Sequence, residues 1–126
     1  MTVPVTAAII NNNGKILIAK RSQRKHLGGY WEFPGGKIEP NETPEVCLKR
    51  EIAEELKINI HIDSFFTENE YSYDKVRISL KSYLCTFISG EIQLIDHDEV
   101  RWVNIEQLNS FNFAPADRPI VDLLTV

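Results

Sequence analysis

The chain has 126 residues, 43% of them hydrophobic and 25% charged, so we expect one globular domain spanning residues 1–126. Its formal net charge of −4 gives no electrostatic footprint for duplex nucleic acid. Two cysteines without disulfide or zinc spacing, no leader peptide and no membrane-length apolar run predict a reduced, cytoplasmic protein without membrane contact.

Two strands joined by a tight turn are expected at the start of the chain. The stretch 3–10 is rich in β-branched residues, and residues 15–19 alternate apolar with polar side chains. Asn12-Asn13-Gly14 between them has hairpin-turn chemistry. A basic cluster then covers residues 20–26, and it is either a solvated loop or a source of cations for a phosphorylated ligand.

Paired glycines punctuate the next stretch, first at Gly28-Gly29 and again at Gly35-Gly36. Glycine lets the backbone approach a ligand or an ion without a Cβ in the way, and a turn with positive φ is the other explanation for the second pair. Trp31 and Phe33 lie just before that pair. We expect both rings in the core rather than stacked on a nucleobase.

A helix is predicted to begin at Thr43-Pro44. Thr43 is a preferred N-cap, Pro44 suits the first helical position, and Glu45 places negative charge at the positive end of the helix dipole. An apolar line at positions i, i+4 and i+8 follows, formed by Leu48, Ile52 and Leu56. One side of this helix is therefore expected to be buried.

A neighbouring side of the same helix carries Glu51, Glu54 and Glu55 within a face roughly 100° wide. Like charges at these spacings destabilise a helix unless a cation offsets them. Mg²⁺ is the natural partner because it prefers carboxylate, carbonyl and water oxygens, and Mn²⁺ is a substitute. A solvated acidic face is the alternative, but the upstream glycines and the flanking Glu42 and Arg50 favour the metal.

Further strands are expected at residues 58–66, 76–88, 91–94 and 100–103. The polar stretch 68–75 is predicted to be an exposed connection. The acidic run 96–99 is the second place where chemistry could sit, and His97 within it is expected to be a surface residue.

The chain is expected to end in two helices. The first is short and covers residues 104–109, and the second is amphipathic, with Ile120, Leu123 and Leu124 at helical spacing and Pro115 in an early position. Strands on both sides of a central helix, with helices at the end, indicate a layered α+β domain.

The order Gly36, Glu42, Arg50-Glu51-Ile52, Glu54-Glu55 and Ile58 resembles the Nudix box, the signature of hydrolases that cleave nucleoside diphosphates linked to another group. Lys57 departs from the box, which usually has glycine at this position. Lysine adopts the left-handed conformation at a helix end less easily than glycine does. The run 31–37 is similar to that of MutT-like nucleoside triphosphate pyrophosphohydrolases, and the segment 113–117 resembles one in CTP pyrophosphohydrolases. The resemblance implies an α/β/α Nudix sandwich around a mixed sheet.

The resemblance also implies roles for individual residues. The metal ligands would be the Gly35 carbonyl, Glu51, Glu54, Glu55 and Asp96, with Glu99 as the substitute for Asp96. Glu51 would accept the proton of the attacking water, Glu54 would take part in catalysis, and Arg50 would hold a carboxylate in place. Arg21, Lys37 and Asp117 would contact the substrate, with Asp117 facing the nucleobase unless it caps the last helix instead.

The implied activity is Mg²⁺-dependent hydrolysis of (deoxy)nucleoside triphosphates to a nucleoside monophosphate and pyrophosphate. Oxidised guanine nucleotides such as 8-oxo-dGTP are expected substrates, which would make this an enzyme of nucleotide pool sanitation and DNA repair. One alternative is hydrolysis of CTP or 5-methyl-dCTP. Another is a non-catalytic sensor domain, although such a domain has no need of a complete carboxylate set.

Overall fold

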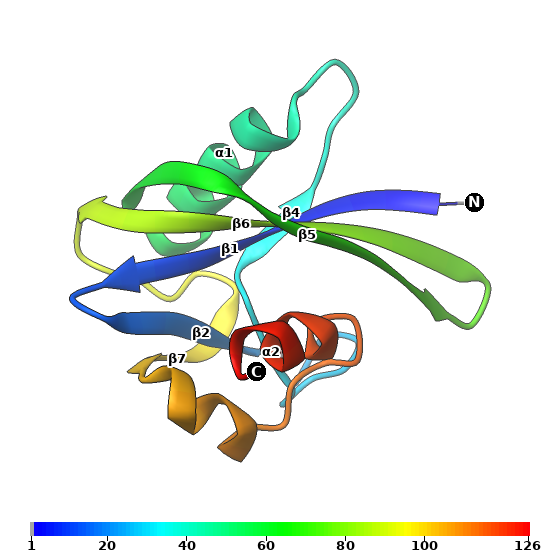
Figure 1. Ribbon diagram of the computed structural model, residues 1–126. Coiled ribbons are helices and arrows are strands. Elements are labelled where there is room, and N and C mark those ends of the chain that lie inside the picture. The colour runs from blue at the N-terminus through cyan, green and yellow to red at the C-terminus, as the bar shows by residue number, and fades with distance from the viewer. Residues whose placement is uncertain (1) are drawn as a thin grey trace.

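The computed structural model describes residues 2–126, and a mixed seven-stranded sheet forms its centre (Figure 1). The elements in chain order are β1 Thr2–Asn12, β2 Lys15–Arg21, β3 Trp31–Glu32, β4 Gly35–Lys37, α1 Pro44–Leu56, β5 Asn59–Tyr73, β6 Val76–Ser89, β7 His97–Val103, the 3₁₀ helix η1 Ile105–Ser110, and α2 Arg118–Leu124.

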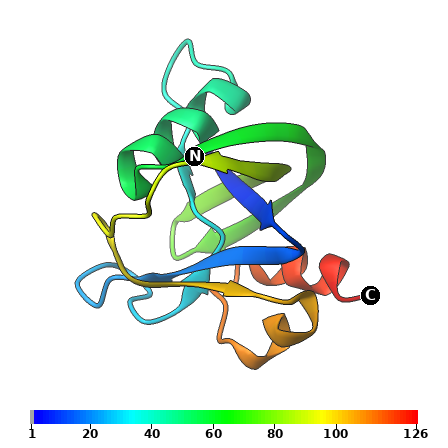
Figure 2. The same ribbon diagram turned by 90° about the vertical axis from the view of Figure 1, so that its left-hand side faces the viewer.

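Strand β1 organises the sheet. It runs parallel to β6 and antiparallel to β2 and β4, while β5 pairs with the far side of β6. On the other side β2 pairs with both β3 and β7. Figure 2 shows the strong twist of the sheet, and β4 pairs with residues 5–7 near the middle of β1. The expected mixed sheet is confirmed.

Two separate cores lie on the two faces of the sheet, because successive side chains of a strand point to opposite faces. Ala8 and Ile10 of β1 pack with the buried line of α1. Ala7 and Ile9 pack with Ile120 of α2 and with η1 on the other face. The α/β/α sandwich implied by the family resemblance is therefore confirmed, with α1 and α2 on opposite sides in Figure 1.

The ends of α1 follow the sequence closely. The Thr43 hydroxyl accepts a hydrogen bond from the Val46 N–H at 3.1 Å, as an N-cap does. At the other end Lys57 takes the left-handed conformation, with φ of 62°, and its N–H donates to the Ala53 carbonyl. The chain thus makes the usual helix ending without glycine, at a steric cost of roughly 1–2 kcal/mol.

Three predictions about the second half of the chain are wrong. Strand β5 continues to Tyr73 instead of ending near residue 66, because residues 68–73 pair with β6 and only Asp74 and Lys75 form the turn. Residues 91–94 form no strand, since they cross the end of α1, where Gln93 N–H donates to the Leu56 carbonyl. Pro115 lies in a turn, and α2 begins only at Arg118.

The expectations for single residues in the core hold. Trp31 and Phe33 are buried in the core on the α2 side. Cys47 and Cys85 are buried free thiols. Within residues 2–126, no helix combines the length and the apolar character needed to cross a membrane.

Candidate active site

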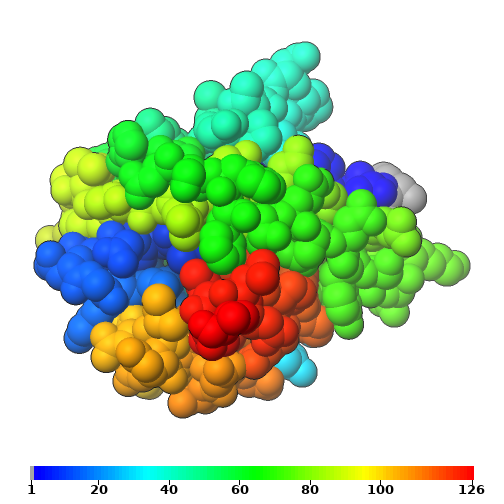
Figure 3. Space-filling model, in the orientation of Figure 1, coloured from blue at the N-terminus to red at the C-terminus, as the bar shows by residue number. Residues whose placement is uncertain are grey.

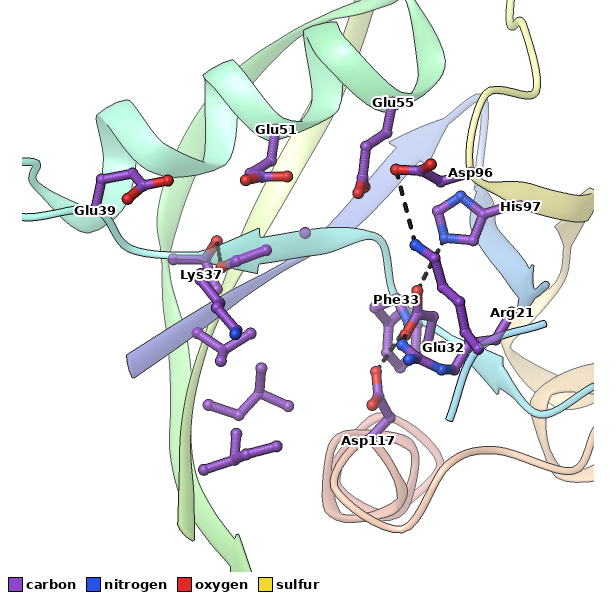
Figure 4. Close-up of a pocket in the computed structure, with 17 residues that line it drawn as sticks. Arg21, Glu32, Phe33, Lys37, Glu39, Glu51, Glu55, Asp96, His97 and Asp117 are labelled. Atoms are coloured by element: carbon purple, nitrogen blue, oxygen red, sulfur yellow. Dashed lines mark hydrogen bonds and ion pairs between the residues drawn. The ribbon is translucent and has the colours of Figure 1, made fainter. Parts of the chain in front are cut away.

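A cleft of about 460 Å³ runs from the acidic side of α1, past β4, to the turn before α2. Figure 4 shows Glu51 and Glu55 hanging from α1 at one end and Asp117 at the other, with Glu32 between them. Of the residues that the sequence indicated, the cleft is lined by Arg21, Gly35, Lys37, Glu51, Glu55, Asp96 and Asp117. Arg50 and Glu54 lie outside its lining.

Strand β4 explains the Gly35-Gly36 pair. A Cβ on Gly35 would collide with the Thr6 carbonyl of β1, and a Cβ on Gly36 would collide with the Glu51 carboxylate. Neither glycine has a positive φ, so the turn explanation is wrong. The pair is needed because the backbone of β4 lies directly between β1 and an acidic side chain of α1.

Three of the carboxylates that line the cleft come from two separate segments. Glu51 and Glu55 are one turn apart on α1, and Asp96 precedes β7. Burial raises the pKa of Glu51, although its bond to Arg50 opposes that shift. Burial, followed by the charges of Glu51, Glu32 and Asp96, raises the pKa of Glu55 to about 8. The Glu55 Oε1 atom is buried and has no hydrogen-bond partner.

Arg50 ties three glutamates together beside the cleft. Its Nε and Nη2 donate to the two oxygens of Glu42 at 2.6 and 3.0 Å, and its Nη1 donates to Glu51 at 3.0 Å and Glu54 at 3.1 Å. The bond from Arg50 is the main reason that the pKa of Glu42 falls to about 2. The Glu54 side chain is 61% exposed, and within residues 2–126 its carboxylate bonds only to Arg50. Its roles as metal ligand and in catalysis remain predictions.

The acidic end of the cleft fits a divalent cation. A buried carboxylate oxygen without a partner is costly unless a cation approaches it, and hard cations such as Mg²⁺ prefer oxygen ligands. Within residues 2–126, no three acidic, histidine or cysteine side chains are placed closely enough to enclose a metal ion unaided. Water and substrate phosphates would have to complete the coordination, as is usual for Mg²⁺.

Metal binding is expected to release a proton from Glu55. In the metal-free protein the pKa of this carboxyl group lies near 8 instead of 4.5, so its ionisation opposes folding as pH rises from about 4.5 to about 8. A bound cation favours the charged form, so at pH 7 binding should expel close to one proton. Titration calorimetry with Mg²⁺ in two buffers of different ionisation enthalpy measures this release. Equal heats in both buffers would contradict it, and Glu55→Gln is the control that should abolish it.

Glu32 and His97 form a buried network that the sequence did not reveal. The two oxygens of Glu32 accept from Arg21 Nη1 at 2.7 Å and pair with His97 Nε2 at 2.9 Å. The His97 side chain is only 4% exposed, so its expected surface position is wrong. Its strand pairs with β2, and that pairing places residue 97 opposite Arg21. The signal in the sequence that could have indicated Glu32 is its position between Trp31 and Phe33, two aromatic residues expected in the core.

The cations of the basic cluster divide into two groups. Arg21 and Lys25 line the cleft, and Lys25 Nζ lies 3.8 Å from Asp96 Oδ2. Arg21 Nε also donates to the His26 carbonyl. Arg24 is exposed and outside the cleft lining. One portion of the cluster is therefore solvated and another brings positive charge to the acidic cleft, and contact of these cations with a phosphorylated ligand stays a prediction.

Asp117 lies at the far end of the cleft, where a smaller side cavity of about 130 Å³ opens. Its Oδ2 accepts a hydrogen bond from the Phe33 N–H at 2.9 Å, and burial, followed by the charge of Glu32, raises its pKa well above the ordinary value. Asp117 occupies the N-cap position of α2, but its side chain makes no capping bond there. The carboxyl group lines both cavities.

The comparisons with known proteins agree with this fold. A NUDIX domain model matches residues 5–123. The chain is 33% identical to the CTP pyrophosphohydrolase of Escherichia coli (strain K12), covering 95% of this chain and 89% of that protein. It is 35% identical to the 8-oxo-dGTP diphosphatase of the same organism, covering 90% and 88% respectively. The solution structure of the MutT protein from methicillin-resistant Staphylococcus aureus 252 superposes with a TM-score of 0.80 at 38% identity, covering 99% and 96%.

The fold and the family match define the class of this protein as a hydrolase of phosphoanhydride bonds, with an acidic helix face over its cleft. Hydrolases of this class generally use a divalent metal. Since the family model covers nearly the whole chain, the protein belongs to the Nudix family.

Proposed function

We propose that this protein hydrolyses (deoxy)nucleoside triphosphates, including 8-oxo-dGTP, to a nucleoside monophosphate and pyrophosphate, with Mg²⁺ as the metal. The single observation that carries the proposal is that acidic and basic side chains line the same cleft. Glu51, Glu55 and Asp96 share the lining with Arg21, Lys25 and Lys37. A ligand that brings a metal cation together with phosphate anions complements both sets.

The metal ligands in this proposal are the Gly35 carbonyl, Glu51, Glu54, Glu55 and Asp96. Bound there, the metal would neutralise phosphate charge and make a water molecule more acidic. Glu54 would have to exchange its bond to Arg50 for this role, because its carboxylate faces that guanidinium. Lys37 and Arg21 line the cleft, and their positively charged side chains would contact the substrate.

Glu51 is the proposed base that accepts a proton from the attacking water. It lies in the cleft, against the backbone of Gly36, and Arg50 fixes its carboxylate by a 3.0 Å bond. The raised pKa caused by burial makes the carboxylate a stronger proton acceptor than an exposed glutamate. Arg50 is therefore proposed to act by positioning Glu51, and its paired bonds to Glu42 keep the guanidinium in place.

The nucleobase would occupy the end of the cleft near Asp117. The similar 8-oxo-dGTP diphosphatase supports oxidised guanine as the first candidate base. A relative named CTP pyrophosphohydrolase supports cytosine nucleotides as the second candidate substrates. Both candidate bases offer N–H donors to a carboxylate.

Asp117→Ala is expected to change the ranking of nucleotides by kcat/KM about tenfold while leaving the Mg²⁺ dependence unchanged. The reason is that a hydrogen bond to a charged or buried acceptor contributes about 1.5 kcal/mol. Steady-state kinetics on a nucleotide panel at several Mg²⁺ concentrations measure both quantities. An unaltered ranking would remove Asp117 from base recognition.

Pyrophosphate release from the same panel, with Mg²⁺ and with a chelator, tests the function itself. We expect release with Mg²⁺, none with the chelator, and the highest kcat/KM for 8-oxo-dGTP. A preference for CTP or 5-methyl-dCTP would favour the second candidate. Nucleotide binding without any turnover would instead indicate a non-catalytic sensor domain.

A further inference from the structure

The segment that carries Asp117 lies in a turn and is held in place from a distant strand. Ala116 immediately precedes Asp117, and both of its backbone polar groups bond to side chains of β5. Asn69 Nδ2 donates to the Ala116 carbonyl at 3.0 Å, and the Ala116 N–H donates to the Tyr73 hydroxyl at 3.1 Å. Figure 3 shows this C-terminal part of the chain packed directly against β5.

The two side chains form a matched pair because they are four residues apart on one strand, and such residues point to the same face. Asn69 can hold the Ala116 carbonyl only through its amide nitrogen, and its Oδ1 is buried without a partner. This unpaired oxygen is a cost that the contact with Ala116 has to offset. The arrangement therefore fixes one residue of the turn by two directional bonds.

Tyr73 also lies at the side cavity, in addition to its bond to the Ala116 backbone. Its ring lines that cavity together with His26, Ala116 and Asp117, and the His26 ring meets it edge-on with centroids 5.4 Å apart. Asp117 has a second restraint at its own carboxylate, where Oδ2 accepts from the Phe33 N–H. The bonds to the Ala116 backbone on one side and the bond to the Asp117 carboxylate on the other restrain the orientation of the Asp117 side chain.

We propose that Asn69 and Tyr73 are positioning residues for nucleobase selection, which act by fixing Ala116 and hence the direction of the Asp117 carboxyl group. This inference rests on the proposed function, because it requires a base at Asp117. Neither residue needs to touch the metal or the reacting phosphate. Their loss should therefore weaken base discrimination and leave the chemistry of hydrolysis unchanged.

Tyr73→Phe and Asn69→Ala test the proposal. Each should reduce the ratio of kcat/KM between the best and the worst nucleotide of the panel about fivefold, the factor that corresponds to one net hydrogen bond. The change should appear in KM for the best nucleotide, with kcat and the apparent Mg²⁺ constant unaltered. Tyr71→Phe is the matched control, since Tyr71 lies on the same strand and, among the bonds within residues 2–126, makes none to residues 113–117.

Double variants with Asp117→Ala separate positioning from a general effect on folding. If Asn69 and Tyr73 act through Asp117, adding either substitution to Asp117→Ala should change the discrimination ratio no further. Additive losses, or single variants that behave like Tyr71→Phe, would overturn the proposal. If Asp117→Ala itself leaves the ranking unchanged, the assignment of the base site fails as well, and absence of pyrophosphate release would refute the proposed function.

Discussion

Replacing Glu51 with glutamine is expected to lower kcat about 100- to 10,000-fold, the range typical for loss of a general base. The amide has nearly the same size as the carboxylate, and its oxygen can still accept the 3.0 Å bond from Arg50. It cannot accept a proton from water at neutral pH. The fold should therefore persist while turnover is lost.

Single-turnover kinetics at saturating Mg²⁺, together with thermal unfolding, measure this prediction. Glu45→Gln is the matched control because Glu45 lies in the first turn of the same helix, exposed and outside the cleft lining. That control should retain full activity. If Glu51→Gln keeps kcat within about threefold of the unaltered protein, another group accepts the proton and Glu51 is not the base.

Glu54→Gln should lower turnover about 100-fold or more at moderate Mg²⁺, since even outer partners of metal ligands cost ten- to a hundredfold when they are removed. The Glu54 carboxylate bonds to Arg50 in the structure, so its role as a ligand requires it to change partners. Raising the Mg²⁺ concentration should restore part of the activity, as expected for a weakened metal site. Near-normal activity at every Mg²⁺ concentration would remove Glu54 from the metal site.

Local chemistry made the central helix predictable. The Thr43 cap, the following proline and the apolar line of residues 48, 52 and 56 are short-range signals, and the structure has each of them in the expected place. The placement of Glu51 and Glu55 on one side also follows from helical geometry alone. That Gly36 of β4 lies against Glu51 required the structure, because it depends on the pairing of β4 with β1.

Contacts between distant segments were not predictable. The polar run around His97 predicts a surface position, but the pairing of β7 with β2 buries this residue against Glu32. The polar composition of residues 68–75 likewise predicts an exposed connection, but pairing with β6 extends β5 through Asn69 and Tyr73. In each case a tertiary partner decided the conformation, and polar composition alone contained no information about that partner.

Anomalous diffraction from crystals grown with Mn²⁺ and a non-hydrolysable nucleoside triphosphate tests most directly whether the acidic side of α1 binds a metal beside a polyphosphate. We expect an anomalous peak in contact with Glu55 and Glu51, with phosphate oxygens completing the coordination. A bound triphosphate with no peak near these carboxylates, or a peak elsewhere in the molecule, would contradict the assignment of this cleft as the active site.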